Sequence, residues 1–101
     1  MNPKLESKFQ GDLIKELRKE YPDAIILKND PNYMQGIPDL VVLWEDRWAA
    51  LECKQSIESM LQPNQAYYVL KMDDMSFATV IAPENKEEVL DALQSAFRAA
   101  R

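Results

Sequence analysis

Residues 36–54 read GIPDLVVLWEDRWAALECK, and this stretch decides the fold. The continuous apolar run at residues 40–44 is typical of a buried strand. The polar residues 45–47 then predict a turn, and residues 48–54 predict the strand that returns beside the first. We therefore expect a β-hairpin with a carboxylate just before its first strand.

The motif residues should converge at the open end of this hairpin. If its loop has two or three residues, Asp39 lies opposite residue 52, 53 or 54 in each register. Because side chains alternate along a strand, Glu52 and Lys54 point to the same face, about 6 to 7 Å apart. The sequence therefore predicts that Asp39, Glu52 and Lys54 form one cluster.

The remaining spacing predicts an α/β fold with elements in the order α-β-β-β-α-β-α. Besides the hairpin, the expected elements are a helix from Asn2-Pro3 to Tyr21-Pro22, a strand at 24–28, a helix opened by Gln62-Pro63, a strand at 76–81 and a C-terminal helix after Pro83. This order predicts a mixed sheet flanked by helices. The length of 101 residues predicts a single domain over residues 1–101.

Composition narrows the chemistry. The chain has no His and one Cys, Cys53, which excludes an internal disulfide and most zinc sites. A catalytic metal would therefore need oxygen ligands, as Mg²⁺ or Mn²⁺ does. The net charge of −5 argues against bulk attraction to nucleic acid. Without an apolar run of membrane-spanning length or a signal-peptide pattern, we expect a cytoplasmic protein with no membrane partner.

Two carboxylates as close as Asp39 and Glu52 would repel each other and raise each other's pKa. A divalent cation between them removes that cost, and Lys54 could then contact a phosphate or orient or deprotonate an attacking water. A lone Glu-x-Lys is usually an exposed strand pair. Here Pro38-Asp39 precedes the Glu-x-Lys by about a dozen residues, on the preceding strand. This spacing favours a functional site over an exposed strand pair.

With these residues in place, the chain resembles the PD-(D/E)xK nuclease superfamily, and this resemblance implies a restriction-endonuclease-like α-β-β-β-α-β core. The likeness runs from Glu6 to about Ile81, and it is greatest to the small virus-type replication-repair nuclease (VRR-NUC) domains and to Holliday-junction resolvases. The shared pattern is a first-helix Glu, Gly-x-Pro-Asp, Glu-x-Lys and a Gln that opens the next helix. Here these are Glu6, Gly36-Ile37-Pro38-Asp39, Glu52-Cys53-Lys54 and Gln65.

The resemblance implies that Asp39, Glu52 and the backbone carbonyl of Cys53 bind the metal. It implies that Lys54 serves the nucleophilic water and the transition state. Gln65 would lie beside the site and position Lys54 or a phosphate.

Two of these assignments have ordinary alternatives. Glu6 would complete the site from the first helix, directly or through water, but it can equally be a solvated helix charge. Gln65 can equally be a polar residue of a first helical turn.

The resemblance implies a divalent-metal-dependent deoxyribonuclease, an endonuclease acting on branched or structured DNA. It implies a phage or bacterial source, and hence the bacterial host cytoplasm if the chain is phage-encoded. The small size and acidic balance fit a homodimer with two active sites. The alternatives are a non-catalytic binding module that kept the fold, and a subunit that cuts only when joined to a replication or recombination partner.

Two further groups of residues lie outside the motif, and we expect different roles for them. Lys28, Asn32 and Tyr33 precede the motif in a loop and are candidates for contact with the nucleic-acid backbone or a splayed base. Trp44 and Trp48 flank the hairpin turn, where we expect them to pack in the core or at a dimer surface.

Overall fold

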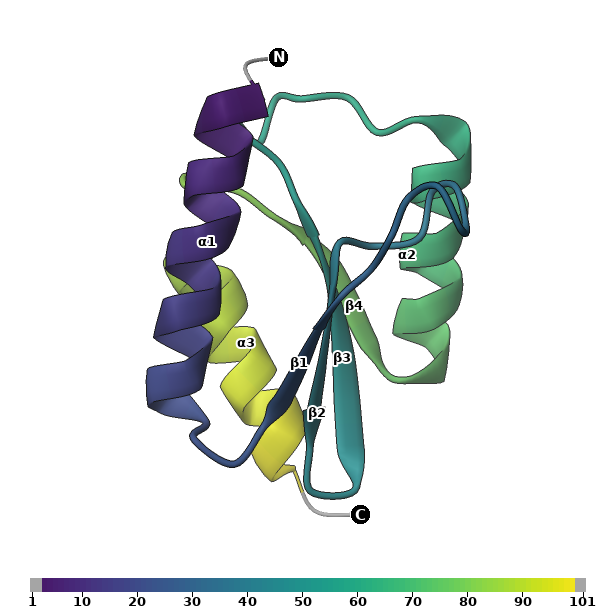
Figure 1. The fold of residues 1–101 in the computed structure, drawn as a ribbon. Helices are drawn as coiled ribbons and strands as arrows, with labels where there is room; N and C mark the ends of the chain where they lie inside the picture. The colour runs from purple at the N-terminus through teal and green to yellow at the C-terminus, as the bar shows by residue number, and fades with distance from the viewer. Residues whose placement is uncertain (1–2, 100–101) are drawn as a thin grey trace.

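A computed structural model describes residues 3–99, in which four strands form one sheet of order β1-β2-β3-β4 (Figure 1). Strands β1 (Ile25–Lys28), β2 (Leu40–Trp44) and β3 (Arg47–Cys53) are antiparallel neighbours. Strand β4 (Phe77–Ile81) lies parallel to β3. The strands differ from the expected ranges by at most one residue at either end.

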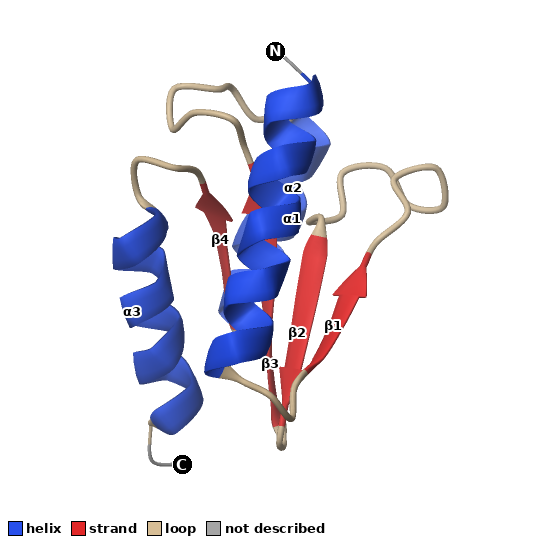
Figure 2. Cartoon of the chain, turned by 60° about the vertical axis from the view of Figure 1, so that its left-hand side comes forward, coloured by secondary structure: helices blue, strands red, loops and turns tan. Residues whose placement is uncertain are grey.

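The three helices lie on both faces of the sheet. Helices α1 (Pro3–Glu20) and α3 (Lys86–Arg98) lie side by side on one face, and α2 (Pro63–Met75) lies on the other (Figures 1 and 2). The expected α/β class, the order α-β-β-β-α-β-α and the C-terminal helix are confirmed. The expected start at Asn2 falls outside the described residues. None of the helices within residues 3–99 is long and apolar enough to cross a membrane.

The hairpin between β2 and β3 turns through two residues only. Trp44 pairs with Arg47, so the turn consists of Glu45 and Asp46. The sequence had suggested that Arg47 belongs to the turn, and this was wrong. Arg47 is the first residue of β3. Of the expected registers, this two-residue turn gives the one in which Leu40 lies opposite Leu51.

The core lies between the sheet and the α1–α3 layer. Its buried side chains alternate along β2 and β3 and meet apolar residues at helical spacing on α1 and α3. At the turn end, the rings of Tyr21, Trp44 and Phe97 pack together with centroids 5.4 to 5.7 Å apart. Of the two expected roles for Trp44, the structure shows core packing. Trp48 is only half-buried and lines a shallow hollow beside Phe77.

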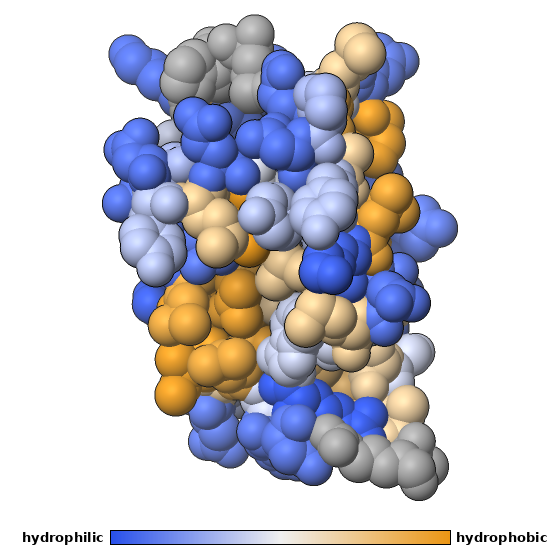
Figure 3. Space-filling model, turned by 90° about the vertical axis from the view of Figure 1, so that its right-hand side faces the viewer, coloured by the Kyte–Doolittle hydropathy of each residue, from blue (hydrophilic) through white to orange (hydrophobic). Residues whose placement is uncertain are grey.

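The second face of the sheet is only partly covered. Helix α2 packs over β3 and β4, where Ala50 and Ala78 are buried. The β1 side is left open, and Ile25 and Leu27 are 59% and 45% exposed. Figure 3 looks at this side of the molecule and shows apolar surface gathered at its lower left. The open half of this face borders the site described next.

Candidate active site

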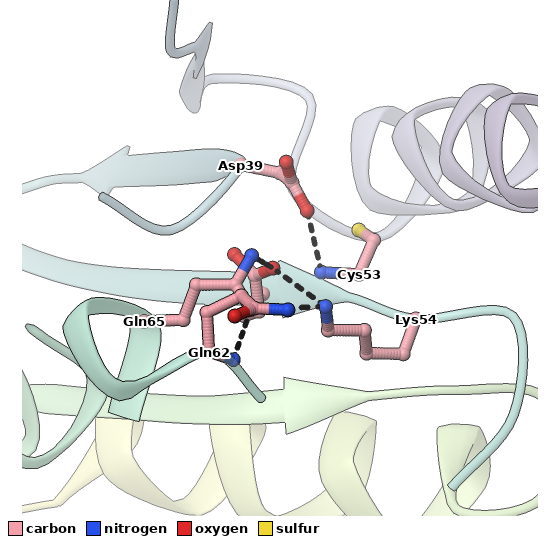
Figure 4. Close-up of polar contacts among 6 residues, drawn as sticks. Asp39, Cys53, Lys54, Gln62 and Gln65 are labelled. Carbon is pink, nitrogen blue, oxygen red and sulfur yellow. Dashed lines mark hydrogen bonds and ion pairs between the residues drawn. The ribbon is translucent and has the colours of Figure 1, made fainter. Parts of the chain in front are cut away.

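Asp39 and Glu52 meet where β2 begins and β3 ends. The pairing of Leu40 with Leu51 puts Asp39 opposite Glu52. Asp39 Oδ2 accepts a hydrogen bond of 2.8 Å from the backbone N–H of Cys53 (Figure 4). This bond fixes the carboxylate beside the chain segment that carries Glu52 and Lys54. The first expected convergence is therefore present.

Lys54 lies within the same cluster, and Gln65 from the first turn of α2 joins it. The ammonium of Lys54 donates to Gln65 Oε1 at 3.1 Å and lies 3.7 Å from Glu52 Oε2. The amide of Gln65 donates to Glu52 Oε2 at 3.2 Å. The Gln65 side chain thus connects Glu52 and Lys54 (Figure 4). Of the two expected roles of Gln65, the structure shows the contact with Lys54.

The orientation of the Gln65 amide is set from both ends. Its Oε1 also accepts a 2.9 Å hydrogen bond from the backbone N–H of Gln62, the residue that precedes α2. A side chain three residues inside a helix commonly reaches back in this way to cap the helix start. The helix start therefore holds Gln65 with its oxygen toward Lys54 and its nitrogen toward Glu52.

Two charged members of this cluster, Glu52 and Lys54, are buried, whereas Asp39 is half-buried. Glu52 is 3% exposed and Lys54 is 5% exposed. Burial, then the nearby charge of Asp39, raises the pKa of Glu52 to about 7, although Lys54 acts in the opposite direction. Burial also raises the pKa of Asp39, despite the Cys53 hydrogen bond and the Lys54 charge. Isolated strand charges would be solvated, so this pair is not an ordinary exposed Glu-x-Lys.

Glu6 approaches from the first turn of α1 and is half-buried. Its pKa is raised by burial and then by the charge of Asp39. The charge of Glu6 in turn raises the pKa of Glu52. The structure therefore places Glu6 within electrostatic reach of both carboxylates, as expected from the first-helix position. It is the most loosely held member of the predicted set.

The Cys53 side chain points away from this cluster. Its thiol is fully buried in the core, where burial raises its pKa and a hydrogen bond from Gln10 partly offsets that rise. Only the backbone of Cys53 lies at the site, which agrees with assigning a role to its carbonyl and none to its sulfur. Gln10, itself buried, connects α1 to the back of β3.

Two supporting residues were missed by the sequence interpretation. Asn29 follows β1, and its backbone N–H donates to the Asp39 carbonyl at 2.8 Å while its side chain donates to the Pro38 carbonyl at 2.7 Å. Gln62 holds Gln65 as described above. The spacing Gln62-x-x-Gln65 resembles a helix cap and could have indicated its role. No pattern near Asn29 indicates a partner nine residues later.

The donor set suits a hard cation. Among the described residues, no three His, Cys, Asp or Glu side chains are grouped so as to hold a metal by themselves. The expected set is different, since it joins two carboxylates to the backbone carbonyl of Cys53. Burial is the largest cause of the raised pKa values of Glu6, Asp39 and Glu52, and the charges of Asp39 and Glu6 add to the rise at Glu52. A divalent cation would favour the ionised form of these carboxylates, so the residues fit Mg²⁺ or Mn²⁺.

Comparison of the chain with protein-family models, with curated proteins and with solved structures finds no match. The likeness to PD-(D/E)xK nucleases therefore stays with the motif residues. The functional argument depends on the motif and on the geometry of the site.

Proposed function

We propose that this protein is a divalent-metal-dependent deoxyribonuclease that hydrolyses internal phosphodiester bonds. The observation that carries the proposal is the hydrogen-bonded group of Asp39, Glu52, Lys54 and Gln65, in which Glu52 and Lys54 are buried. Burying a carboxylate beside an ammonium gives little net stability, and perturbed buried acids concentrate at functional sites. Pro38-Asp39 directly precedes β2, and Glu52-Cys53-Lys54 lies at the end of the neighbouring strand β3. This arrangement agrees with the pattern of the PD-(D/E)xK superfamily.

Asp39 and Glu52 would hold the metal together with the Cys53 carbonyl, and Glu6 would add a fourth oxygen directly or through water. When bound, the cation would polarise the scissile phosphate and offset the charge that develops on its oxygens. Lys54 carries three N–H bonds, and its contacts with Gln65 and Glu52 orient the ammonium. The geometry supports a role for Lys54 in holding the attacking water or a phosphate oxygen.

The substrate and the assembly belong to the same proposal. Branched or structured DNA is the substrate that the resemblance supports. A homodimer would give two active sites that read the shape of a branch, and it would cover part of the open sheet face. The net charge of −5 requires that DNA be gripped by local contacts and the bound metal.

The test is cleavage of a supercoiled plasmid and a four-way DNA junction by the purified chain with Mg²⁺, Mn²⁺ or a chelator. We expect metal-dependent cutting that falls at least about 100-fold in Lys54→Ala and in Asp39→Asn. Asparagine keeps an acceptor for the Cys53 amide, so Asp39→Asn removes the charge while keeping the structural bond. Asp91→Asn, on the exposed side of α3, is the matched control and should cut normally.

The outcomes separate the alternatives. Full metal-dependent cutting by Asp39→Asn would show that the site is misassigned. No cutting of either DNA by the wild-type chain would exclude an autonomous nuclease. Cutting restored by a replication or recombination partner would favour the partner-dependent subunit, and tight DNA binding without cutting would favour the binding module.

A further inference from the structure

A second hollow lies on the sheet face that carries the candidate active site. It has a volume of about 500 Å³ and is mostly apolar. Its walls come from the end of β1, the loop that follows and β2. The lining residues are Asn29, Asp30, Tyr33, Met34, Ile37 and Val41. None of them has a part in the chemistry proposed above.

The hollow adjoins Asp39 directly. Val41 and Asp39 are alternate residues of one extended segment, so their side chains share a face about 6 to 7 Å apart. Asn29, in the opposite wall, holds the Pro38 and Asp39 carbonyls through the two hydrogen bonds described above. A nucleotide whose phosphate lies at Asp39 therefore has the hollow within the reach of its own sugar and base.

The loop that forms the rim is held in a defined conformation. Backbone N–H groups of Tyr33 and Ile37 donate to the carbonyls of Asp30 and Met34, at 3.1 and 3.4 Å. Gly36 adopts φ +88°, and a Cβ built there would lie 2.8 Å from the Asn64 backbone at the start of α2. The loop is thus seated against the helix that supplies Gln65.

Tyr33 stands exposed on this fixed rim. Its side chain is 87% exposed, and no aromatic ring or cation within residues 3–99 stacks on it. An ordered but unpartnered ring beside a nucleic-acid site is a stacking surface, since each base offers a π-face. Met34 and Val41 contribute apolar lining to the hollow. Side-chain oxygens of Asn29 and Asp30 can accept hydrogen bonds from a base amino group.

We propose that this hollow receives an unpaired nucleobase of the DNA strand being cut, one nucleotide from the scissile phosphate, with Tyr33 stacked on it. The inference rests on the proposed nuclease function and adds a requirement for a splayed nucleotide in the substrate. Branch points and flaps supply such unpaired nucleotides, whereas intact duplex must be distorted to do so.

The test compares cleavage of intact and abasic DNA. The cutting position is first mapped on a flap or four-way junction, and an abasic site is then placed on either side of it. We expect wild-type cleavage to fall about tenfold when one of the two flanking bases is missing. Tyr33→Ala should show a similar fall on intact DNA and little further response to the abasic site. Tyr33→Phe should behave as wild type.

The control variant is Tyr67→Ala, which removes another exposed tyrosine, on α2 outside the hollow. It should cut both substrates as the wild type does. If the wild type cuts but Tyr33→Ala loses nothing, or responds to the missing base as the wild type does, the subsite is wrong and the nuclease stands. If Tyr33→Ala instead turns a dimer into a monomer by sedimentation, the hollow is an interface between copies. If no DNA is cut, both proposals fall together.

Discussion

The two ends of the β2–β3 hairpin are built on opposite principles. At the turn end, the rings of Tyr21, Trp44 and Phe97 pack edge to face and face to face, and the Arg98 guanidinium lies 5.6 Å from the Trp44 ring centroid. At the open end, the charged side chains of Glu52 and Lys54 are buried, and burial raises the pKa of Glu52. The turn end contributes apolar burial to the stability of the fold, whereas the open end keeps charged side chains away from water, which costs free energy.

The largest effect on stability should come from the turn end. Phe97→Ala removes a buried ring that contacts both Tyr21 and Trp44, and it should lower the free energy of unfolding by about 3 to 5 kcal/mol. Urea unfolding followed by tryptophan fluorescence measures the change. Leu70→Ala, on the exposed face of α2, should change it by less than about 0.5 kcal/mol. Equal losses in the two variants would show that the aromatic cluster is not the main support of the hairpin.

At the open end, removing a charge should increase stability. The pKa of Glu52 rises from 4.5 to about 7 in the folded chain. Between these values the unfolded chain releases the proton while the folded chain keeps it, so the free energy of unfolding falls as pH rises from about 4.5 to 7. The full difference is about 3 kcal/mol. Glu52→Gln should therefore be the more stable protein at pH 8 and lose most of its advantage at pH 4.5.

The measurement is urea unfolding at pH 4.5 and pH 8 in the presence of chelator, with the exposed Glu88→Gln as the matched control. The raised pKa values of Asp39 and Glu6 act in the same direction, so Glu52→Gln should keep a reduced slope with pH. Mg²⁺ or Mn²⁺ at pH 8 should raise the melting temperature of the wild type much more than that of Glu52→Gln. Parallel pH profiles would contradict a buried, strained carboxylate.

Local sequence patterns predicted the hairpin and the charged cluster at its open end. The hairpin follows from an apolar run, a polar turn and a second run, because burial and alternation are local properties of the chain. The convergence of Asp39 on residues 52–54 follows from the hairpin, since every two- or three-residue turn places Asp39 opposite one of them. Lys54 shares the face of Glu52 for the same reason. The cluster was therefore predictable from one local element.

Local patterns did not predict the supporting contacts, because these connect distant elements, and only the family resemblance placed Gln65 beside Lys54. The angle at which α2 crosses the sheet decides whether Gln65 meets Lys54, and nothing local encodes that angle. Asn29 reaches Pro38 only because the loop between β1 and β2 folds back. The exposed position of Tyr33 depends on the same loop, in which Gly36 contacts Asn64.

Gly36→Ala tests whether that loop supports the open end. A methyl group at Gly36 would meet the Asn64 backbone, and φ +88° is strained for alanine. We expect the free energy of unfolding to fall by about 1 to 3 kcal/mol, with a loss of cleavage beyond that of unfolding because the loop leads into Asp39. The measurements are urea unfolding and cleavage at a temperature where the variant remains folded. Normal cleavage by the folded variant would show that the loop conformation is not needed to hold the site.

Gly11→Ala is the matched change where nothing opposes it, and it should have the smallest effect. A Cβ at Gly11 meets no other atom within 4 Å, and the residue lies inside α1. Alanine restricts the unfolded chain and favours helix, so the free energy of unfolding should rise by about 0.5 to 1 kcal/mol with cleavage unchanged. Gly11 follows Gln10, which contacts Cys53 behind the site. A Gly11→Ala variant that is more stable but cuts poorly would therefore contradict the expectation that this part of α1 leaves cleavage unchanged.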